Sequence, residues 1–369
     1  MSGLTELLRA ADHAFAERPH LPLALATLYA VEGSSYRQPG ARMLVDTEGR
    51  VLAGAISGGC LEGDVAAYAA DVCAQSCAKQ LTYDLRDDLQ TIWGFDAKCD
   101  GVAHVLLEPL PDWQWMRTAC DAQEQRQITA LVSRIESSTA GGTRLIGACN
   151  DMVQHLVQRT LAERPSSSAN VETPLLLDHD GVSLFVQPIV PPVSIVLIGA
   201  GRGAEAFARI ARTLHWRVTV VDHRPAVLES LDLAPDVQRC VLRPEEGTSL
   251  LTVDERTAIA LLTHQFAMDL EWLLQLLPLS LAYIGVLGSR ARAAHLMHTV
   301  HERGLDVTPA MQHRFFAPIG LDLGGETPES IALASIAEIE AVVHGRPGGA
   351  LRDRTSPIHS RTPTPHVGA

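Results

Sequence analysis

Long apolar runs are scarce in this 369-residue sequence. The run from Leu23 to Val31 is about half the length that a membrane-spanning helix needs. Residues 1–15 have no cationic stretch followed by an apolar core, which a signal peptide requires. We therefore expect a cytoplasmic protein that has no membrane partner.

Basic side chains are also few, with 30 Lys and Arg against 43 Asp and Glu, a net charge of −13. Binding to nucleic acid or to an anionic membrane requires a basic surface, so this balance argues against both, although it permits a local basic pocket. The composition, 46% hydrophobic and 20% charged, is that of an ordinary globular protein. The length predicts two domains.

Cysteine pairs at metal-binding spacing are absent. Seven cysteines are scattered along the chain without a C-x-x-C pair, which argues against a structural zinc site and favours reduced thiols. The two that could carry chemistry are Cys60 and Cys99. The others are interpreted as packing or structural residues: Cys73, Cys77, Cys120, Cys149 and Cys240.

A strand–turn–helix–strand unit with a glycine-rich turn lies between Ser194 and Arg224. Its parts in order are a strand at 195–198, then Gly199, Gly201 and Ala204 at G-x-G-x-x-A spacing, a helix, a strand at 218–221 and Asp222. The first glycine permits a tight turn, the second lets a phosphate approach the backbone, and the acid can accept hydrogen bonds from a ribose. The pattern predicts a Rossmann-type half; a glycine-rich turn that binds nothing is the alternative.

The fold class predicted is α/β, with an N-terminal α/β domain followed by a Rossmann-like, doubly wound parallel sheet. Strands are expected at 195–198, 218–221, 258–263 and 283–287, and strands that alternate with helices form parallel sheets. The proline pair at 191–192 breaks the chain, so we place the domains at 1–190 and 191–345. Residues 346–369 are rich in Pro, Ser, Thr and Gly, which predicts a disordered tail.

Polar and glycine residues follow the strands of the C-terminal domain. Ligands of doubly wound sheets bind beyond the carboxyl ends of the strands. Asp222 favours an unphosphorylated ribose and Arg224 a phosphate, so the choice between NAD and NADP stays open. Ser289 caps a helix and marks a second anion site. The candidate binding residues of this rim are Gly199, Gly201, Arg202, Asp222, His223, Arg224, His264, Ser289, Arg290 and Asp322.

A second constellation is Ser57-Gly58-Gly59-Cys60-Leu61-Glu62. Two glycines before a helix let the backbone close on a bulky ligand. We expect Cys60 in the first helical turn, where the dipole and unpaired amides favour a thiolate, a better metal ligand or nucleophile. A buried, inert cysteine is the alternative.

Four stretches resemble a known family: GSSYRQPGARMLV (33–45), GAISGGCLEGDV (54–65), VLIGAGRGAEAFARIARTLHWRVTVVDHRPA (196–226) and APIGLDLGGETPESIALASIAEIEAV (317–342). THQFAMDLEWL (263–273) and YIGVLGSRAR (283–292) add to the resemblance. The family is the XdhC/CoxI group, accessory proteins for xanthine dehydrogenase and related molybdenum hydroxylases. The resemblance implies an XdhC/CoxI domain followed by a Rossmann domain.

The resemblance also implies a function. Such proteins bind the molybdenum cofactor, as molybdopterin or its cytosine dinucleotide, while a cysteine desulfurase replaces an oxo ligand with sulfido. They then pass the cofactor to an apo xanthine dehydrogenase-family enzyme, without turnover of their own, and a homodimer is expected. Cys60 is the expected metal ligand. The other cofactor-binding candidates in the N-terminal domain are Arg42, Ser57, Gly58, Gly59, Glu62 and Cys99.

The sequence departs from the family pattern at four positions, of which Gly325 and Ser330, in place of Ala and Glu, are mild changes. Tyr36 stands where a proline often precedes the arginine, and Asp100 follows Cys99 where a glycine is expected. The second change puts the shape of the 94–101 loop in doubt. Two other functions stay open: an NAD(P)-dependent oxidoreductase in which His264 is an acid or base, and a nucleotide-sensing regulatory module.

Overall fold

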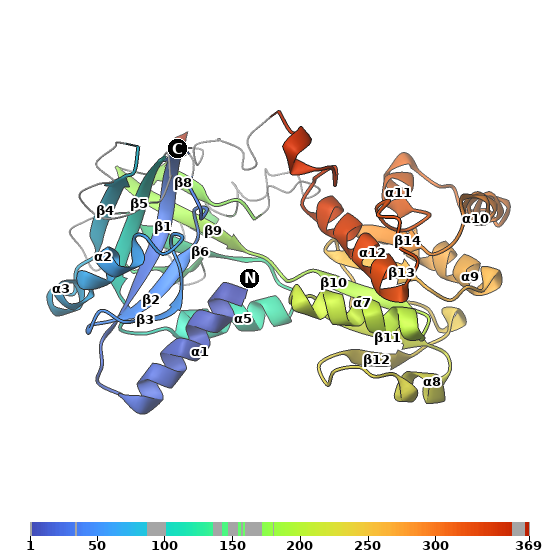
Figure 1. The fold of residues 1–369 in the computed structure, drawn as a ribbon, viewed down its shortest axis with the longest axis horizontal. Helices are drawn as coiled ribbons and strands as arrows, with labels where there is room; N and C mark the ends of the chain where they lie inside the picture. Colours follow the sequence, from blue (N-terminus) through green and yellow to red (C-terminus); the bar gives the residue numbers. More distant parts are fainter. Residues whose placement is uncertain are drawn as a thin grey trace. The chain divides into compact units, whose positions relative to one another are not determined.

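The computed structural model describes residues 2–33, 35–86, 101–135, 142–146, 154–155, 158, 172–179, 181–355 and 366–368. The chain divides into two compact units. The first unit comprises Met1–Pro191 with Arg354–Ala369, and the second comprises Pro192–Asp353 (Figure 1). Cys99 and Cys149 lie outside the described residues.

The second unit is built on a six-stranded parallel sheet with the order β12-β11-β10-β13-β14-β15. From the centre, the chain runs outward from β10 through β11 to β12, and then from β13 through β14 to β15. The direction therefore reverses between β10 and β13, as in a Rossmann fold. Its strands are β10 Ser194–Ile198, β11 Arg217–Asp222, β12 Gln238–Val241, β13 Thr257–Leu261, β14 Tyr283–Val286 and β15 Phe315–Phe316.

Four of these strands confirm the sequence prediction, while β12 and β15 were not predicted. Both are short edge strands, and β12 is largely exposed, so neither carries the continuous apolar run of a buried parallel strand. The helices are α7 Arg202–Thr213, α8 Pro225–Ser230, η2 Pro244–Glu246, α9 Phe266–Leu276, α10 Arg290–Glu302, α11 Pro309–His313 and α12 Pro328–Val343.

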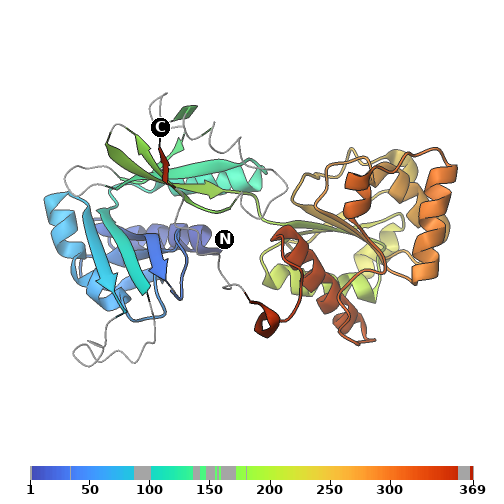
Figure 2. The same ribbon diagram turned by 90° about the horizontal axis from the view of Figure 1, so that it is seen from above.

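Helices cover both faces of this sheet (Figure 2). Successive side chains of a strand point to opposite faces, so Ile195 and Leu197 pack in one core with α7 and α12. Val196 and Ile198 pack in the other core with α9 and α10. Helix α12 begins as predicted, with Pro328 in its first turn and Thr327 Oγ1 accepting the Ser330 amide at 3.2 Å.

Among the described residues, the first unit contains two sheets, of order β3-β2-β1-β5-β4 and β16-β8-β9-β6-β7, where β16 is His366–Gly368. The predicted hairpin of β2 and β3 is confirmed as an antiparallel pair. The strands are β1 Leu23–Gly33, β2 Arg42–Asp46, β3 Val51–Gly54, β4 Lys79–Asp84, β5 Gly101–Pro109, β6 Thr129–Arg134, β7 Arg144–Leu145, β8 Leu175–His179 and β9 Val182–Ile189. The helices are α1 Ser2–Glu17, α2 Glu62–Ala67, α3 Ala69–Gln75 and α5 Gln114–Glu124.

The central strand β1 is buried on both sides. Ala24, Ala26 and Leu28 pack in a core with α2 and α3. Leu23 and Leu25 face a different core with α1 and α5. This burial explains why β1 reads as an almost continuous apolar run although its neighbours are antiparallel.

Two short pieces of the C-terminal tail have regular secondary structure. Leu351–Asp353 forms a turn of 3-10 helix, and His366–Gly368 forms β16, which pairs in parallel with β8. Main-chain hydrogen bonds to a sheet edge need no particular side chains, so a tail poor in core-forming residues can still add a strand.

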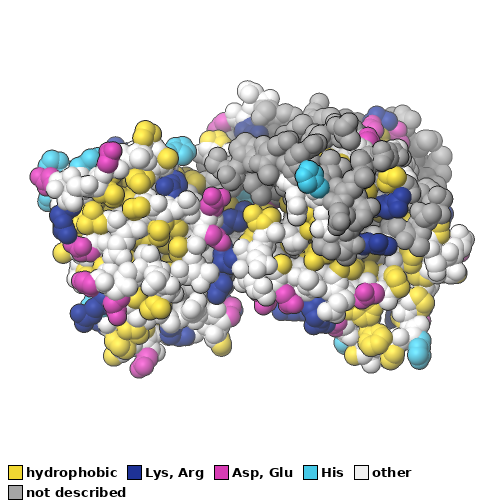
Figure 3. Space-filling model, turned by 180° about the vertical axis from the view of Figure 1, so that it is seen from behind, with side chains coloured by type: hydrophobic (Ala, Val, Ile, Leu, Met, Phe, Trp, Pro, Cys, Tyr) yellow, Lys and Arg dark blue, Asp and Glu magenta, His cyan; other side chains and the backbone are white. Residues whose placement is uncertain are grey.

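Across the described residues, no helix has the length and apolarity needed to cross a membrane. The face drawn in Figure 3 mixes acidic with basic side chains.

Candidate functional site

The second unit contains a cavity of about 440 Å³ beyond the carboxyl ends of β10, β11 and β13. Its inner wall is apolar and includes Met268, Trp272 and Leu287. Its polar side is formed by three segments, residues 199–203, 222–224 and 263–265. A concave apolar site with a few convergent polar groups at the switch point of a doubly wound sheet is typical of a small-molecule pocket.

The glycine-rich turn has the shape that the sequence predicts. Gly199 has φ +113°, and a Cβ there would lie 2.8 Å from the carbonyl carbon of Leu262, so no larger residue fits without a shift of the backbone. A Cβ on Gly201 would meet nothing within 4 Å, which leaves its backbone open to a ligand. Helix α7 starts at Arg202 without a side-chain cap, so its first amides can bind an anion.

The Asp222 carboxylate is 3% exposed and is already occupied by donors of this chain. It accepts hydrogen bonds from the Ala200 amide at 2.7 Å, the Arg224 amide at 3.0 Å, and Arg224 Nε and Nη2 at 2.9 Å each. Burial alone would raise the pKa of Asp222, but these hydrogen bonds outweigh it and hold the pKa at about 2. The carboxylate that the sequence predicts to accept hydrogen bonds from a ribose thus already accepts them from the turn and from Arg224.

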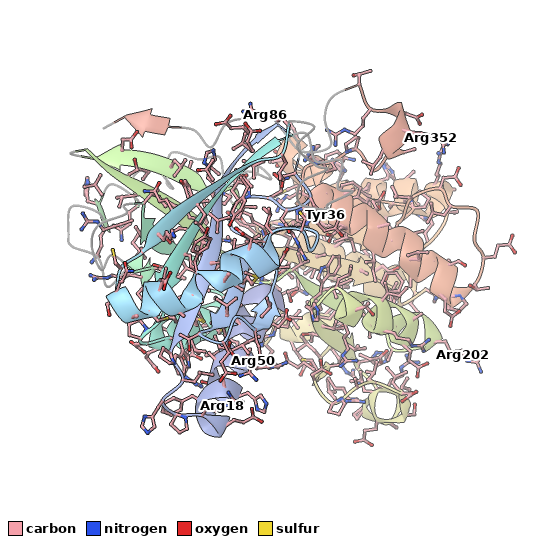
Figure 4. All side chains as sticks on the ribbon, turned by 60° about the vertical axis from the view of Figure 1, so that its left-hand side comes forward. Arg18, Tyr36, Arg50, Arg86, Arg202 and Arg352 are labelled. Carbon is pink, nitrogen blue, oxygen red and sulfur yellow. The ribbon has the colours of Figure 1, made fainter. Side chains whose placement is uncertain are left out.

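Four basic side chains lie around the mouth of the cavity: Arg202, His223, Arg224 and His264. Arg202 is exposed and projects from the start of α7 (Figure 4). His223 Nδ1 lies 3.4 Å from an Asp222 oxygen. His264 is exposed and has φ +58°, an uncommon left-handed conformation for a residue with a side chain.

A buried ion pair holds the segment that carries His264. Asp269 is fully buried in α9 and accepts a hydrogen bond from Thr263 Oγ1 at 2.6 Å and one from Arg292 Nη2 at 2.5 Å. Thr263 Oγ1 in turn accepts the Gln265 amide at 3.1 Å. The sequence reasoning did not assign Asp269 or Arg292. The available signal was a single acid, Asp269, in the otherwise apolar first turn of FAMDLEWLLQL.

Three predicted rim residues do not line this cavity. Ser289 caps α10 as predicted, with its Oγ accepting the Arg292 amide at 3.2 Å. Ser289, Arg290 and Asp322 are exposed, and none of the three is part of the cavity wall. The other seven predicted rim residues do line it: Gly199, Gly201, Arg202, Asp222, His223, Arg224 and His264.

In the first unit, the loop before α2 is organised by Glu62. Its carboxylate accepts the amides of Ile56, Ser57 and Leu61 at 3.2, 2.8 and 3.2 Å, and also the Ser57 hydroxyl. Burial raises the pKa of Glu62, but the hydrogen bonds from Ser57 and the amides lower it by more. Ser57 Oγ accepts the Leu61 amide at 3.1 Å. The carboxylate and hydroxyl thus hold the loop in a curled shape.

The placement of Cys60 corrects one expectation. Helix α2 begins at Glu62, so Cys60 precedes the helix instead of lying in its first turn, and α2 is only six residues long. The amides on either side of Cys60, those of Gly59 and Leu61, donate to Ser57 Oγ, and the Leu61 amide also donates to Glu62. The Cys60 thiol is half-buried, 3.5 Å from Ser57 Oγ.

The glycines leave room on the exposed side of this loop. Gly59 has φ +110°, and a Cβ on it would meet nothing within 4 Å. A Cβ on Gly58 would lie 3.4 Å from the ring of Tyr36, an exposed side chain labelled in Figure 4. The loop therefore exposes the Gly58 backbone beside an aromatic ring and leaves open space at Gly59, which suits a bulky ligand.

Arg42, predicted to bind a cofactor, points into the interior of the first unit. It is 8% exposed, and its Nη1 donates to Gln187 Oε1, which joins β2 to β9. Its Nε and Nη2 are buried without a hydrogen-bond partner among the described residues. Burial lowers the pKa of Arg42 to about 10, although the charge of Glu108 opposes the shift. The alternation of β2 places this side chain on a covered face, where a ligand at the surface does not reach it.

Glu108 at the end of β5 is the acidic counterpart of Arg42. It is buried and accepts hydrogen bonds from the Thr143 amide at 2.8 Å and from the Thr143 hydroxyl. Thr143 Oγ1 also lies 2.7 Å from Ser133 Oγ. Burial raises the pKa of Glu108 to about 7, against the effects of Thr143 and Arg42. The sequence reasoning did not assign this polar cluster.

Within the described ranges, no group of three or more His, Cys, Asp or Glu residues is arranged to hold a metal ion. Cys99, the other candidate thiol, lies outside the described residues.

The fold and the cavity define a class: a Rossmann-type binding protein that carries an additional α/β unit with a cysteine in a glycine-rich loop. Sequence models of two families match the chain, the "XdhC Rossmann domain" at residues 195–339 and the "XdhC and CoxI family" at residues 16–84. A relative from Bacillus subtilis, named as a probable xanthine dehydrogenase subunit, is 31% identical over 85% of this chain and 91% of its own length. The chain therefore belongs to the XdhC and CoxI family.

Two further comparisons agree with this family. The "Molybdenum cofactor insertion chaperone PaoD" of Escherichia coli is 23% identical over 86% of this chain and 82% of its own length. The crystal structure of a protein described as a xanthine dehydrogenase from Bacillus halodurans matches with a TM-score of 0.71 and 25% identity, covering 96% of this chain and 98% of that one. Both units thus share their folds with a solved protein.

We predict that Asp269→Asn lowers the free energy of unfolding by about 3 kcal/mol, because the change leaves the Arg292 guanidinium half-buried without its charge partner. Urea unfolding measures the effect. The control is Asp236→Asn, which removes an exposed ion pair with Arg212 and should cost less than about 1 kcal/mol. Equal losses in the two variants would contradict the structural role of the buried pair.

A second prediction concerns pH. The pKa of Glu108 rises from 4.5 to about 7 on folding, so between these values the folded state keeps a proton that the unfolded state has lost. Stability therefore falls as pH rises through this window, by up to about 3 kcal/mol, and levels off above it. Arg42, the charged group facing Glu108, stays protonated throughout because its pKa is about 10.

Urea unfolding at pH 5 and at pH 7.5 tests this effect. Wild type should lose stability between the two values by more than Glu108→Gln does, since the amide keeps an acceptor for Thr143 but cannot ionise. The same pH dependence in both proteins would show that Glu108 does not titrate in this window.

Proposed function

We propose that this chain binds the molybdenum cofactor as cargo, holds it during sulfuration and delivers it to a xanthine dehydrogenase-family molybdoenzyme. Membership of the XdhC and CoxI family supports the proposal. A relative named as a molybdenum cofactor insertion chaperone supports it further. The function proposed is therefore that of a carrier without turnover of its own.

The observation that carries the proposal is the Cys60 loop. The Cys60 side chain, once deprotonated, is a thiolate that can serve as a metal ligand. The thiol is half-buried, and the loop around it is held in one shape by Glu62 and Ser57. A ligand held in one conformation loses less entropy when its guest binds, so such a loop is suited to capture. The loop around the bound cofactor would be shaped by Ser57, Gly58, Gly59 and Glu62.

The cavity of the second unit supports the binding of an anionic part of a ligand. Open amides at the start of α7 and the Arg202 and Arg224 guanidinium groups are the donors that phosphates prefer. The apolar wall with Trp272 suits a flat heterocycle. The cofactor, in either its molybdopterin or its cytosine dinucleotide form, combines a heterocycle with phosphate.

Further parts of the proposal concern partners. Sulfuration requires a sulfur donor, and a cysteine desulfurase is the donor proposed. The recipient is an apo molybdoenzyme of the xanthine dehydrogenase family, in agreement with the name of the Bacillus subtilis relative. We place the carrier in the cytoplasm and expect it to act as a homodimer.

Cys60→Ala tests the proposal. The full chain is produced in cells that make the cofactor, purified, and analysed for molybdenum by mass spectrometry and for pterin by fluorescence after oxidation. We expect wild type to carry both and Cys60→Ala to carry at most about a tenth as much, since the metal loses its protein ligand.

Cys73→Ala is the matched control. Cys73 is another half-buried thiol that packs against the same core, and it donates to the Leu23 carbonyl at 3.4 Å. This variant should retain the wild-type molybdenum content. If wild type carries no more molybdenum than Cys60→Ala, the role given to Cys60 is wrong.

A further inference from the structure

The corner of the second-unit cavity at the end of β11 contains a feature that family membership does not explain. In a Rossmann fold the acid at the end of the second strand normally accepts hydrogen bonds from a ribose. An ionised carboxylate has about four acceptor positions. Four donors of this chain meet Asp222, namely two amides and two nitrogens of the Arg224 side chain. A ribose hydroxyl would have to displace one of them.

Each of these bonds also holds the site together. The Ala200 amide belongs to the glycine-rich turn, so displacing it would disturb the approach to α7. The two side-chain bonds from Arg224 form a paired contact at 2.9 Å each, the planar geometry in which a guanidinium and a carboxylate bind most strongly. A neutral hydroxyl gains less than it would remove, because hydrogen bonds between charged groups are stronger than those to neutral groups.

The same pair presents its positive half to the cavity mouth. The Arg224 side chain is 47% exposed, whereas that of Asp222 is 3% exposed, so an incoming ligand meets the cation and not the anion. A guanidinium has five N–H donors, and only two point to Asp222. His223 and Arg202 line the same cavity. These groups are suited to a group with two negative charges.

We propose that the Arg224 corner of the cavity binds a phosphate monoester and discriminates against an unphosphorylated ribose diol. Arg224 is the specificity-determining residue. Asp222 is a positioning residue that orients the guanidinium and removes itself as a ribose acceptor.

A phosphate monoester could come from two sources. One is the 2′-phosphate of a dinucleotide such as NADPH, which is independent of the function proposed above. The other is the terminal phosphate of the pterin cofactor in its molybdopterin form, a source that rests on that function. Arg224 would bind the same group, a phosphate monoester, in both cases. The experiment therefore needs one arm for each source.

The first arm measures NADPH and NADH binding to the full chain by calorimetry, with Trp272 in the cavity wall providing a fluorescence signal. If the phosphate comes from a dinucleotide, NADPH should bind at least about tenfold more tightly than NADH. Arg224→Gln should abolish this preference, and Arg224→Lys should keep part of it, since Lys retains the charge without the fork. Tighter binding of NADH than of NADPH would overturn the proposal.

The second arm compares the pterin content of protein purified from cells that make the cofactor. If the phosphate belongs to the pterin, Arg224→Gln should reduce this content at least about fivefold without a dinucleotide preference in wild type. The control in both arms is Arg212→Gln, which lies on the same helix as Arg202 but outside the cavity wall.

Loss of pterin from Cys60→Ala but not from Arg224→Gln, together with equal dinucleotide affinities, would overturn the present inference and leave the proposed function standing. If wild type carries no molybdenum but prefers NADPH in a way that depends on Arg224, the present inference stands and the proposed function is overturned. Absence of any Arg224-dependent effect in both arms overturns the inference whatever the cofactor content of wild type.

Discussion

The cavity rim of the second unit depends on one buried carboxylate. Asp222 ends β11 and accepts hydrogen bonds from the glycine-rich turn after β10 and from Arg224. These contacts connect the ends of two neighbouring strands through a single side chain. The positions of the turn, the start of α7 and the basic rim therefore all depend on Asp222. Because the carboxylate is buried, its hydrogen bonds are stronger than they would be in water. The shape of the turn and the charge of the rim are therefore coupled.

The two units differ in whether their buried charged side chains are paired. In the second unit Asp269 and Arg292 meet directly, and the pair supports the segment that carries His264. In the first unit Arg42 and Glu108 are both buried, but among the described residues no ion pair joins them, and the pKa of each is shifted toward its neutral form. A direct contact compensates the loss of hydration, whereas separated groups retain most of that cost. The direct Asp269–Arg292 contact therefore holds its segment in place, whereas the separated Arg42 and Glu108 make the stability of the first unit dependent on pH.

Much of the fold could be predicted from local patterns. Apolar runs located the four central strands of the Rossmann sheet, and the G-x-G-x-x-A spacing located the glycine-rich turn after β10. The edge strands β12 and β15 were missed because edge strands need no apolar run. At the site, the sequence identified the residues around the cavity mouth but not Asp269 or Arg292, whose roles come from their mutual contact.

Taken by itself, the sequence determined where the backbone must turn and which segments must be buried. Gly199 shows this, because the absence of a Cβ is a property of one residue and its φ angle. The tertiary structure decided which partner each polar side chain has. Arg42 could not be distinguished from a surface ligand-binding residue until β9 covered it, and Asp222 could not be distinguished from a ribose acceptor until the Ala200 amide, 22 residues away, reached it. Hydrogen-bond partners depend on distances between segments that are remote in the chain, and local patterns carry no information about those distances.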